Sequence, residues 1–320
     1  MVWEFRMPLD ADAIKAKALE LGFHKVGIAA VPHTASDASH PFALAAQKLQ
    51  EWLGQGYQAD MSWMADPRRQ AIQQVMPNAR AVIAVAINYY TPHIHSDAVG
   101  KAKISRYGWG RDYHKVLQRR LKALRTWLEA QDETVQTRCY VDTGPIPEKA
   151  LAQQAGLGWI GKHSTLITRE YGSWVFLGEI LTNLDLTPDS PHTDHCGTCT
   201  RCIDACPTQA IAQPYVVDAN RCIAYHTIEN RAAELPEAIA EQLDGWVAGC
   251  DICQDVCPWN ERFAQETDIP DFQPYPWNRD PDLSDLAQLA PSDWDHRFRA
   301  SALRRIRHDM MQRNAKASLT

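Results

Sequence analysis

The first of two cysteine runs in the chain reads Cys196-Gly197-Thr198-Cys199-Thr200-Arg201-Cys202-Ile203-Asp204-Ala205-Cys206-Pro207. A second run reads Cys250-Asp251-Ile252-Cys253-Gln254-Asp255-Val256-Cys257-Pro258. In such runs, closely spaced cysteines wrap one cubane 4Fe-4S cluster, whereas the cysteine before proline is carried away and binds the other cluster. The two runs therefore predict two 4Fe-4S clusters and a function in electron transfer.

The crossing of the last cysteine assigns ligands to both clusters. Cluster 1 is expected to use Cys196, Cys199, Cys202 and Cys257. Cluster 2 is expected to use Cys206, Cys250 and Cys253, which leaves one position to fill. Cys222 lies between the runs and is the one remaining cysteine nearby. We therefore expect Cys222 to complete cluster 2.

Other uses of cysteine fit the sequence less well. Residues 1–6 form neither a secretory signal nor a twin-arginine signal, so a cytoplasmic location is expected, where disulfides are rare. Structural zinc sites usually pair two Cys-x2-Cys hooks across a longer spacer. Cys139, the ninth cysteine, stands in an apolar run and is expected to be a buried strand thiol.

Composition narrows the function classes. The chain has 320 residues, of which 45% are hydrophobic and 22% charged, enough for about two domains. No apolar stretch approaches the ~20 residues that span a bilayer, so we expect no membrane insertion. The net charge of -6 argues against a generally basic nucleic-acid coat, but residues 297–316 are rich in arginine. That stretch is compatible with a solvated basic helix and equally with a phosphate-binding surface.

Alternating patterns predict an α/β layered domain over residues 1–185. The expected helices are 13–21, 42–53, 113–130 and 148–155, and the expected strands are 25–30, 81–90, 135–141 and 174–182. Strand 81–90 is β-branched and uncharged, which favours a central position. Proline-rich linkers at 188–191 and 270–281 separate a cluster domain, 186–262, and a basic helical tail, 263–320.

Two segments of the first domain carry candidate chemistry. Val141-Asp142-Thr143-Gly144-Pro145 places a carboxylate at the end of a strand, where open α/β sheets bind ligands. Taken alone, Asp142 is more simply a helix N-cap. The segment 156–162 has three glycines that would permit close approach of a planar or phosphate-bearing ligand, although it matches no standard nucleotide motif.

Together, these motifs resemble the epoxyqueuosine reductase family. The matching segments are Arg106-Tyr107-Gly108-Trp109-Gly110-Arg111-Asp112-Tyr113-His114-Lys115, Val141-Asp142-Thr143-Gly144-Pro145, Gly156-Leu157-Gly158-Trp159-Ile160-Gly161-Lys162, Cys196-Gly197-Thr198-Cys199 and Gly249-Cys250-Asp251-Ile252-Cys253-Gln254-Asp255-Val256-Cys257-Pro258-Trp259-Asn260. The resemblance implies a nitroreductase-like α/β domain that holds base-off cobalamin against a ferredoxin-like domain. It implies reduction of epoxyqueuosine in tRNA to queuosine, with electrons passing from the clusters to cobalamin and the epoxide oxygen leaving as water.

The resemblance also implies particular site residues. Asp142 is expected to be the proton donor, with a pKa that burial raises. Residues expected to line the cobalamin are Tyr107, Asp142, Lys162, Ser164, Leu166, Ala224, Tyr225 and Asp251. Residues expected to contact tRNA are Arg297, Arg299, Arg304 and Arg305. No Asp-x-His-x-x-Gly motif is present, so no lower axial histidine is expected, and the chain lacks the longer helical array of many family members.

Rival interpretations use the same cysteines. A reductive dehalogenase-like reductase would combine cobalamin with two clusters, but such enzymes are typically exported. A ferredoxin-type electron carrier would leave the first 185 residues without a purpose. A nucleic-acid-binding protein with structural clusters would bind tRNA without turnover. We expect the reductase, working as a monomer with a low-potential electron donor.

Overall fold

A four-stranded sheet forms the centre of the first half of the chain. The computed structural model describes residues 9–32 and 41–319, so residues 1–6, on which the signal-peptide prediction rests, lie outside it. The strand order is β1 (Lys25–Ala30), β2 (Ala81–Asn88), β7 (Val175–Thr182) and β4 (Thr137–Tyr140). Every neighbouring pair is antiparallel. The strand predicted to be central, β2, pairs on both sides and is buried throughout.

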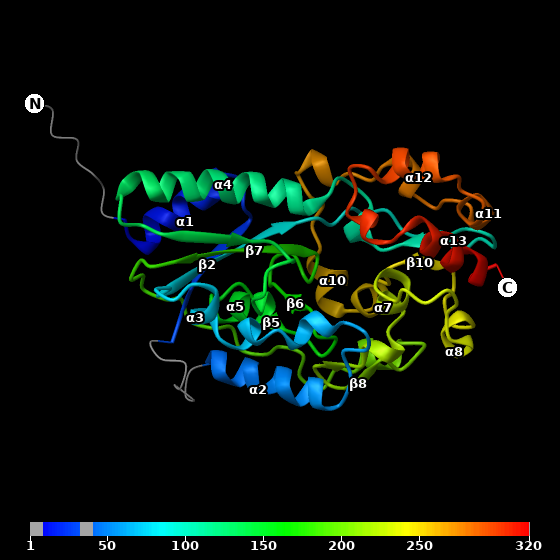
Figure 1. Ribbon diagram of the computed structural model, residues 1–320, viewed down its shortest axis with the longest axis horizontal. Helices are drawn as coiled ribbons and strands as arrows, with labels where there is room; N and C mark the ends of the chain where they lie inside the picture. Colours follow the sequence, from blue (N-terminus) through cyan, green and yellow to red (C-terminus); the bar gives the residue numbers. More distant parts are fainter. Residues whose placement is uncertain (1–8, 33–40, 320) are drawn as a thin grey trace, which may run out of the picture.

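Helices cover both faces of this sheet (Figure 1). One face carries α1 (Ala11–Glu20) and α4 (Tyr113–Gln131), and the other carries α2 (Pro41–Gly54), α3 (Ile72–Val75) and α5 (Glu148–Gln154). Side chains of β2 alternate between the two, because successive residues of a strand point to opposite faces. Ile83 and Val85 pack with α4, whereas Val82 and Ala84 pack with α5. The predicted α/β layering is therefore confirmed.

The cysteine-rich half consists of short elements. They are α6 (Arg201–Asp204), β8 (Ile211–Gln213), β9 (Val216–Val217), α7 (Ile223–Ile228), α8 (Glu237–Ala240), β10 (Trp246–Ala248), α9 (Ile252–Asp255) and α10 (Pro258–Phe263). Two short strands of the first half, β5 (Trp159–Ile160) and β6 (Leu166–Ile167), form a hairpin whose Trp159 and Ile167 pack against Cys257. Single-turn 3-10 segments occur at Ser62–Ala65, Pro67–Gln70, Arg106–Gly108, Ala219–Arg221, Pro270–Phe272, Pro276–Asn278 and Ala302–Arg305.

The C-terminal segment folds back onto the rest of the chain. It contains α11 (Leu283–Ala287), α12 (Pro291–Phe298) and α13 (His308–Ala317). Strand β3 (Lys103–Ile104) pairs in parallel with β10, and Trp109, Phe298 and Met311 share one buried core over this pair. Residues 263–319 are thus interwoven with segments from both other parts, because their apolar side chains have no core of their own to fill.

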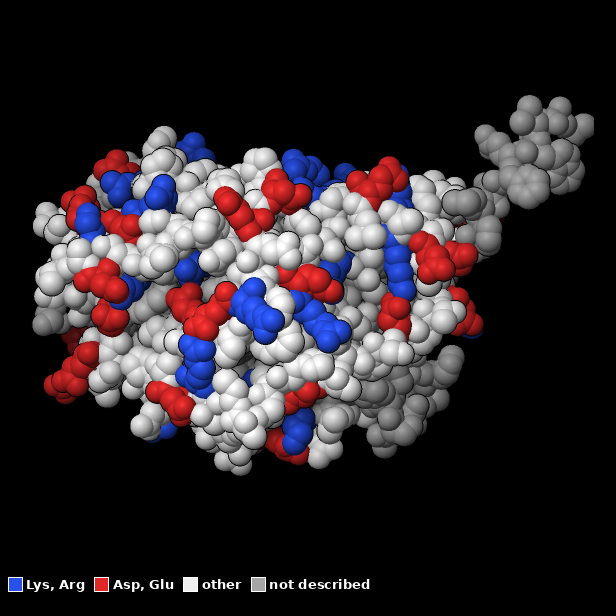
Figure 2. Space-filling view, turned by 180° about the vertical axis from the view of Figure 1, so that it is seen from behind, with Lys and Arg blue, Asp and Glu red and all other residues white. Residues whose placement is uncertain are grey.

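Charges are distributed without one dominant sign. Figure 2 shows acidic and basic side chains interspersed over the face opposite the view of Figure 1. Within residues 9–32 and 41–319, no helix is both long enough and apolar enough to cross a membrane.

Candidate active site

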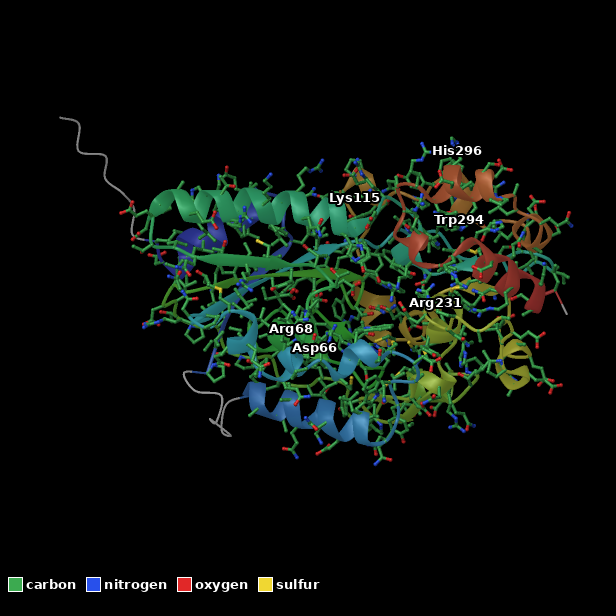
Figure 3. All side chains as sticks on the ribbon, in the orientation of Figure 1. Asp66, Arg68, Lys115, Arg231, Trp294 and His296 are labelled. Carbon is green, nitrogen blue, oxygen red and sulfur yellow. The ribbon has the colours of Figure 1, made fainter. Side chains whose placement is uncertain are left out.

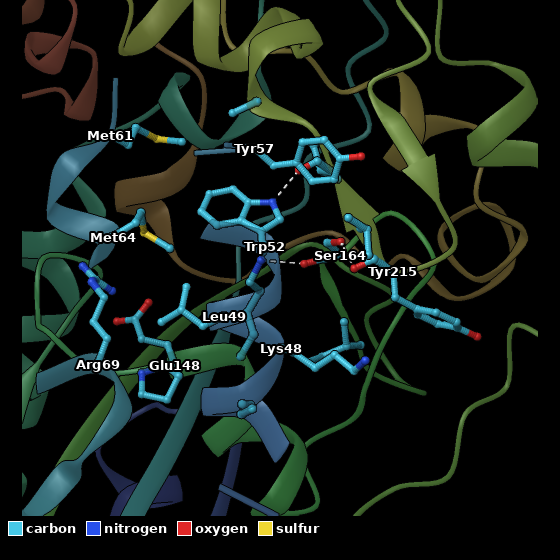
Figure 4. Close-up of a pocket in the computed structure, with 18 of the residues that line it drawn as sticks. Lys48, Leu49, Trp52, Tyr57, Met61, Met64, Arg69, Glu148, Ser164 and Tyr215 are labelled. Carbon is cyan, nitrogen blue, oxygen red and sulfur yellow. Dashed lines mark hydrogen bonds between the residues drawn. The ribbon is translucent and has the colours of Figure 1, made fainter. Parts of the chain in front are cut away.

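A large cavity lies between the sheet domain and the cysteine-rich half. Its volume is about 2390 Å³, well above the roughly 300–1,000 Å³ of sites for drug-sized ligands. Helix α2 and the 3-10 segments after it supply one wall, with Trp52, Met61 and Met64, and the 212–217 loop supplies Tyr215 (Figure 4). The cavity can therefore accept a ligand larger than an ordinary metabolite.

The first group of thiols brings together three cysteines of the first run and one of the second. Burial raises the pKa of Cys202 to about 11, and the neighbouring thiols Cys257, Cys196 and Cys199 raise it as well. Like charges raise one another's pKa only at short range. These four residues are the predicted ligands of cluster 1.

The second group is centred on Cys253. Burial raises the pKa of Cys253 and of Cys250, and the charge of Cys222 raises both. Cys206 acts on Cys222 and Cys250 in the same way. Cys222 is also the one cysteine among the residues that line the cavity. The predicted ligands of cluster 2 thus lie near one another, and Cys222 reaches the cavity wall.

Neither thiol group is arranged around a single ion. Within the described residues, no three His, Cys, Asp or Glu side chains are close enough to hold one metal ion. Thiolates that bind a cubane contact four different irons and so stand farther apart than the ligands of one zinc. Packing four thiolates together requires positive charge between them, since ligands must be deprotonated to bind. This donor set fits an iron-sulfur cluster better than structural zinc.

Asp142 lies in the cavity wall on a left-handed stretch of backbone. Its φ is +56°, an uncommon conformation for a residue other than glycine. Its backbone N–H donates a hydrogen bond to the Glu148 carboxylate. The N-cap of α5 is Pro147. Interpreting Asp142 as a helix N-cap is therefore wrong, because the chain makes a full turn at 142–147 before the helix begins.

The charge state of Asp142 depends on His114. The Asp142 carboxylate Oδ2 lies 3.2 Å from His114 Nε2, and His114 Nδ1 lies 2.8 Å from Asp112 Oδ1. Burial would raise the pKa of Asp142, but hydrogen bonds from His114 and Tyr113 outweigh it and leave the pKa below its usual value. The pKa of Asp142 is therefore lowered, contrary to the expectation that it is raised, because folding places His114 beside the carboxylate.

His114 holds the proton that Asp142 lacks. Burial alone would lower the pKa of His114, but its two carboxylate neighbours, Asp112 and Asp142, raise it to about 9. In Figure 3, the labelled Lys115, which follows His114 in α4, shows that the N-terminal end of this helix lies beside the C-terminal segment. His114 lies in the segment 106–115 that carries the family resemblance, but its role was not predicted. Its two carboxylate partners, Asp112 and Asp142, are 30 residues apart in the sequence and meet only in the folded chain.

Two glutamates stand beside Asp142, the partly buried Glu148 of the cavity lining and the fully buried Glu179. Glu148 opens α5, and Glu179 lies on β7 opposite Ala84 and Tyr140. Glu179 is fully buried, and neither of its carboxyl oxygens has a hydrogen-bond partner in the described structure. Burial and the charge of the other member raise the pKa of Glu179. Both residues were missed, since nothing in the sequence signals that the helix start faces the middle of β7.

The residues expected to line the cobalamin separate into two sets. Those that line the cavity are Tyr107, Asp142, Ser164, Ala224 and Tyr225. The others lie elsewhere: Lys162 Nζ donates to the carbonyls of Gly197 and Cys199, Leu166 is buried in the core, and Asp251 accepts hydrogen bonds from Ser105 and Arg106. Lys162 thereby supports the loop of the first cysteine run.

The glycines of segment 156–162 serve packing. A Cβ atom on Gly158 would collide with the backbone of Ile167, and one on Gly161 would meet the side chain of the same residue. The predicted close approach is therefore that of the β5–β6 hairpin, and not that of a ligand. Trp159 of this hairpin is fully buried against Cys196 and Cys257, and its indole N–H lacks an acceptor within the described parts of the chain.

The four arginines expected to contact tRNA also separate. Arg299 and Arg304 both pair with Asp295, at 2.9 and 2.6 Å, and Arg304 lies over the ring of Trp294. Trp294 and His296 mark α12 at the outer edge of the molecule, away from the ion pair of Asp66 and Arg68 in the cavity wall (Figure 3). Arg297 has no ion pair among the described residues.

Arg305 is the one of the four that lines the cavity. It pairs with Glu229 at 2.6 Å and lies over the ring of Trp63, 5.3 Å from its centroid. Its charge also lowers the pKa of Asp142. A cation, an aromatic ring and the Asp142 carboxylate thus face the same space.

Comparison with known proteins decides the family. A family model described as "Epoxyqueuosine reductase QueG, DUF1730" matches residues 69–143, and one described as "4Fe-4S double cluster binding domain" matches residues 195–260. A protein of Synechocystis sp. named epoxyqueuosine reductase is 62% identical over 92% of this chain and 100% of its own length. The chain belongs to the epoxyqueuosine reductase family.

Other members support the same assignment. An epoxyqueuosine reductase of Gloeobacter violaceus is 53% identical over 97% of this chain and 95% of its own length. A crystal structure of epoxyqueuosine reductase with an epoxyqueuosine-modified tRNA-Tyr stem loop superposes with a TM-score of 0.86 at 28% identity, covering 96% of this chain and 80% of that one. The structure from Streptococcus thermophilus gives a TM-score of 0.84 at 29% identity, with the same coverage of 96% and 80%. The family and its fold are therefore those that the sequence motifs predicted.

Proposed function

We propose that this chain reduces epoxyqueuosine in tRNA to queuosine, using two 4Fe-4S clusters and base-off cobalamin. The observation that carries the proposal is that Cys222, from the second thiol group, and Asp142 line the same cavity. An electron source and a carboxyl group thus reach one space from opposite domains. Reductive opening of an epoxide requires both.

The thiol groups support a direction for electron flow. Cys196 and Cys199 are partly exposed in the loop of the first run, whereas the second group reaches the cavity through Cys222. We assign entry to cluster 1, from a low-potential donor, and delivery to cluster 2. Potentials of such clusters span about -700 to +450 mV, and this function requires the low end.

The cavity fits cobalamin by size and by its donors. Its volume exceeds that of ordinary ligand sites, and five of the residues expected to line the corrin line it. His114 is the one histidine in the lining, and both of its nitrogens face carboxylates. No lining histidine is thus free to become a lower ligand, which agrees with the base-off form. When bound, the cofactor supplies a cobalt centre that can pass two electrons to the substrate.

Residues of the chain supply a proton and direct it to the departing oxygen. Opening the epoxide breaks one C–O bond, and loss of the oxygen as water breaks the second. The whole conversion consumes two electrons and two protons and leaves a carbon–carbon double bond. We assign to Asp142 the delivery of a proton to the departing oxygen. Because the pKa of Asp142 is lowered and that of His114 is raised to about 9, the pair holds one proton at neutral pH, on His114. Asp142 would take this proton from His114 Nε2, 3.2 Å away, as it delivers a proton to the departing oxygen.

Arg305 supports binding of the anticodon loop. Among the arginines expected to contact tRNA, it is the one that lines the cavity, beside Trp63. Aromatic rings and guanidinium planes are common stacking partners for unpaired bases. Arg299 and Arg304 share Asp295 and do not line the cavity. The natural setting that we propose is a monomer in the reducing cytoplasm, where tRNA and thiolate-bound clusters coexist.

The test is direct. The chain should be purified anaerobically, its iron and cobalt counted, and conversion of epoxyqueuosine to queuosine in tRNA measured with a low-potential donor. We expect about eight irons, stoichiometric binding of added cobalamin and turnover that depends on it. Zinc in place of iron, or turnover that is indifferent to cobalamin, would refute the proposal. An electron carrier without this activity would bind no cobalamin.

A further inference from the structure

Two acidic side chains meet beside Asp142, where the partly buried Glu148 of the cavity lining faces the fully buried Glu179. Glu179 points from the middle of β7 toward the face that α5 covers, and Glu148 stands in the first turn of α5. Burial is the largest cause that raises the pKa of both glutamates. Beside it, the charge of Glu148 raises the pKa of Glu179 and a hydrogen bond with Glu179 lowers that of Glu148, which places the two carboxyl groups within short range. Glu148 also accepts the backbone N–H of Asp142.

Two negative charges are not stable in this position. Glu179 is fully buried, and within the described residues no side chain or backbone group donates to either of its oxygens. An isolated buried carboxylate costs far more free energy than a protonated one. Lys149, the nearest cation on α5, donates instead to the Ser164 carbonyl at 2.6 Å. One proton shared by the pair removes the repulsion and gives each acid a partner.

We propose that Glu148 and Glu179 share one proton and act together as positioning residues for Asp142. When Glu179 is protonated and neutral, Glu148 can keep a carboxylate oxygen hydrogen-bonded to the backbone N–H of Asp142. This hydrogen bond holds the left-handed backbone at Asp142. Backbone strain of this kind costs roughly 1–3 kcal/mol and persists only where neighbours enforce it. The shared proton thus controls the orientation of the Asp142 side chain without contact with the substrate.

The groups that face the pair set its pH response. Asp142 and His114 face it from the loop after β4 and from α4, Lys149 lies beside it on α5, and Tyr140 is opposite Glu179 in the sheet. The carboxylate of Asp142 favours protonation of the pair, whereas His114 opposes it. Loss of the shared proton at alkaline pH would place a second charge beside Glu148 and release the Asp142 amide.

Infrared spectroscopy tests the shared proton apart from catalysis. A protonated carboxyl group gives a carbonyl stretch that a carboxylate lacks, and the protein with its clusters can be measured without tRNA. We expect a buried carboxyl band at pH 7 that disappears in Glu179→Gln. It should be unchanged in Glu20→Gln, which alters an exposed glutamate paired with Lys17. A wild-type spectrum without such a band would overturn the proposal.

Kinetics tests the positioning role, which rests on the proposed function. Glu148→Gln keeps an oxygen for the Asp142 amide and should retain kcat within about threefold. Glu148→Ala removes that oxygen and should lower kcat by about 10- to 100-fold, with KM for tRNA nearly unchanged. Glu179→Gln keeps a neutral partner at every pH, so its activity should extend to higher pH than that of the wild type. Iron content and circular dichroism check that each variant folds.

The outcomes are separable. Full kcat in Glu148→Ala, or an alkaline limb unchanged in Glu179→Gln, would contradict the positioning role even if the infrared band is present. Absence of any epoxyqueuosine reduction by the wild type would refute the proposed function, while the infrared experiment would still decide whether the pair holds a proton.

Discussion

The imidazole of His114 lies 3.2 Å from the carboxylate of Asp142, although 28 residues separate them. This contact reverses the expected charge states at the site. The carboxyl group predicted to be protonated is the more acidic member, and the neighbouring histidine carries the proton. Together they form an acid whose two parts come from α4 and from the loop after β4.

Asp142→Asn should abolish turnover while the clusters remain. The amide keeps the size of the side chain but cannot deliver a proton, and general acids contribute about 10²–10⁴-fold to rate. The measurement is single-turnover conversion of epoxyqueuosine in tRNA, beside the visible spectra of the clusters and of bound cobalamin. Near-normal activity with intact spectra would reject the assigned role.

Removal of His114 should change how stability depends on pH. Because the pKa of His114 in the folded chain is about 9, above the usual 6.5, its proton stabilises the fold fully below pH 6.5. This stabilisation is lost as the pH rises through 9. Urea denaturation should show the wild type roughly 1–3 kcal/mol more stable than His114→Gln at pH 6, with the difference vanishing above pH 10. A difference that is constant with pH would show that His114 only packs.

Cys222→Ala should remove one cluster and leave the other. The wild type is expected to hold about eight irons and the variant about four. Cys139→Ala is the matched control, because Cys139 lies on β4 away from both thiol groups and should leave the iron content unchanged. Eight irons in Cys222→Ala would show that cluster 2 takes its fourth ligand elsewhere.

Trp159→Phe should make cluster 1 harder to reduce. The buried indole N–H packs against Cys196 and Cys257 and has no other acceptor in the described structure. Hydrogen bonds to cluster sulfurs raise the potential by stabilising the more negative reduced state. A tenfold weaker reduction equilibrium would appear as a shift of about -59 mV. Redox titration followed by electron paramagnetic resonance measures it, and cluster 2 in the same sample should not shift.

Arg305→Ala should weaken tRNA binding more than Arg299→Ala. Both arginines are paired with a carboxylate, but only Arg305 lines the cavity. Loss of one phosphate contact there would reduce the slope of log affinity against log salt by about 0.7–0.9. Binding of a modified anticodon stem loop at several salt concentrations distinguishes the two variants. Equal slopes for Arg305→Ala and the wild type would place the tRNA contacts on other residues.

Much of the architecture was predictable from local patterns. The helix over Tyr113–Gln131 was predicted at 113–130, and strand Lys25–Ala30 was predicted without error. Hydrophobic periodicity reports on burial within one element, so long, strongly patterned segments are recognised reliably. The cysteine spacing likewise predicted which thiols lie near one another, because a short loop with fixed cysteine spacing can wrap only one cubane cluster.

The interweaving of the C-terminal segment was not predictable. Its arginines suggested a solvated or phosphate-binding tail, but Phe298, Leu303 and Met311 complete a core with Trp109. Arg313 donates to the backbone carbonyls of His226 and Asn230 inside this region. Composition counts charges without showing which of them will find partners after folding.

The sequence by itself determined the family, the two cluster motifs and the candidate acid, since each resides in contiguous residues at fixed spacing. Only the tertiary structure decided the protonation of the site. It brings His114, Glu148 and Glu179 from three elements to Asp142. The pKa of a carboxyl group depends on charges within a few ångströms, and that neighbourhood is set by packing between elements, which no local pattern records.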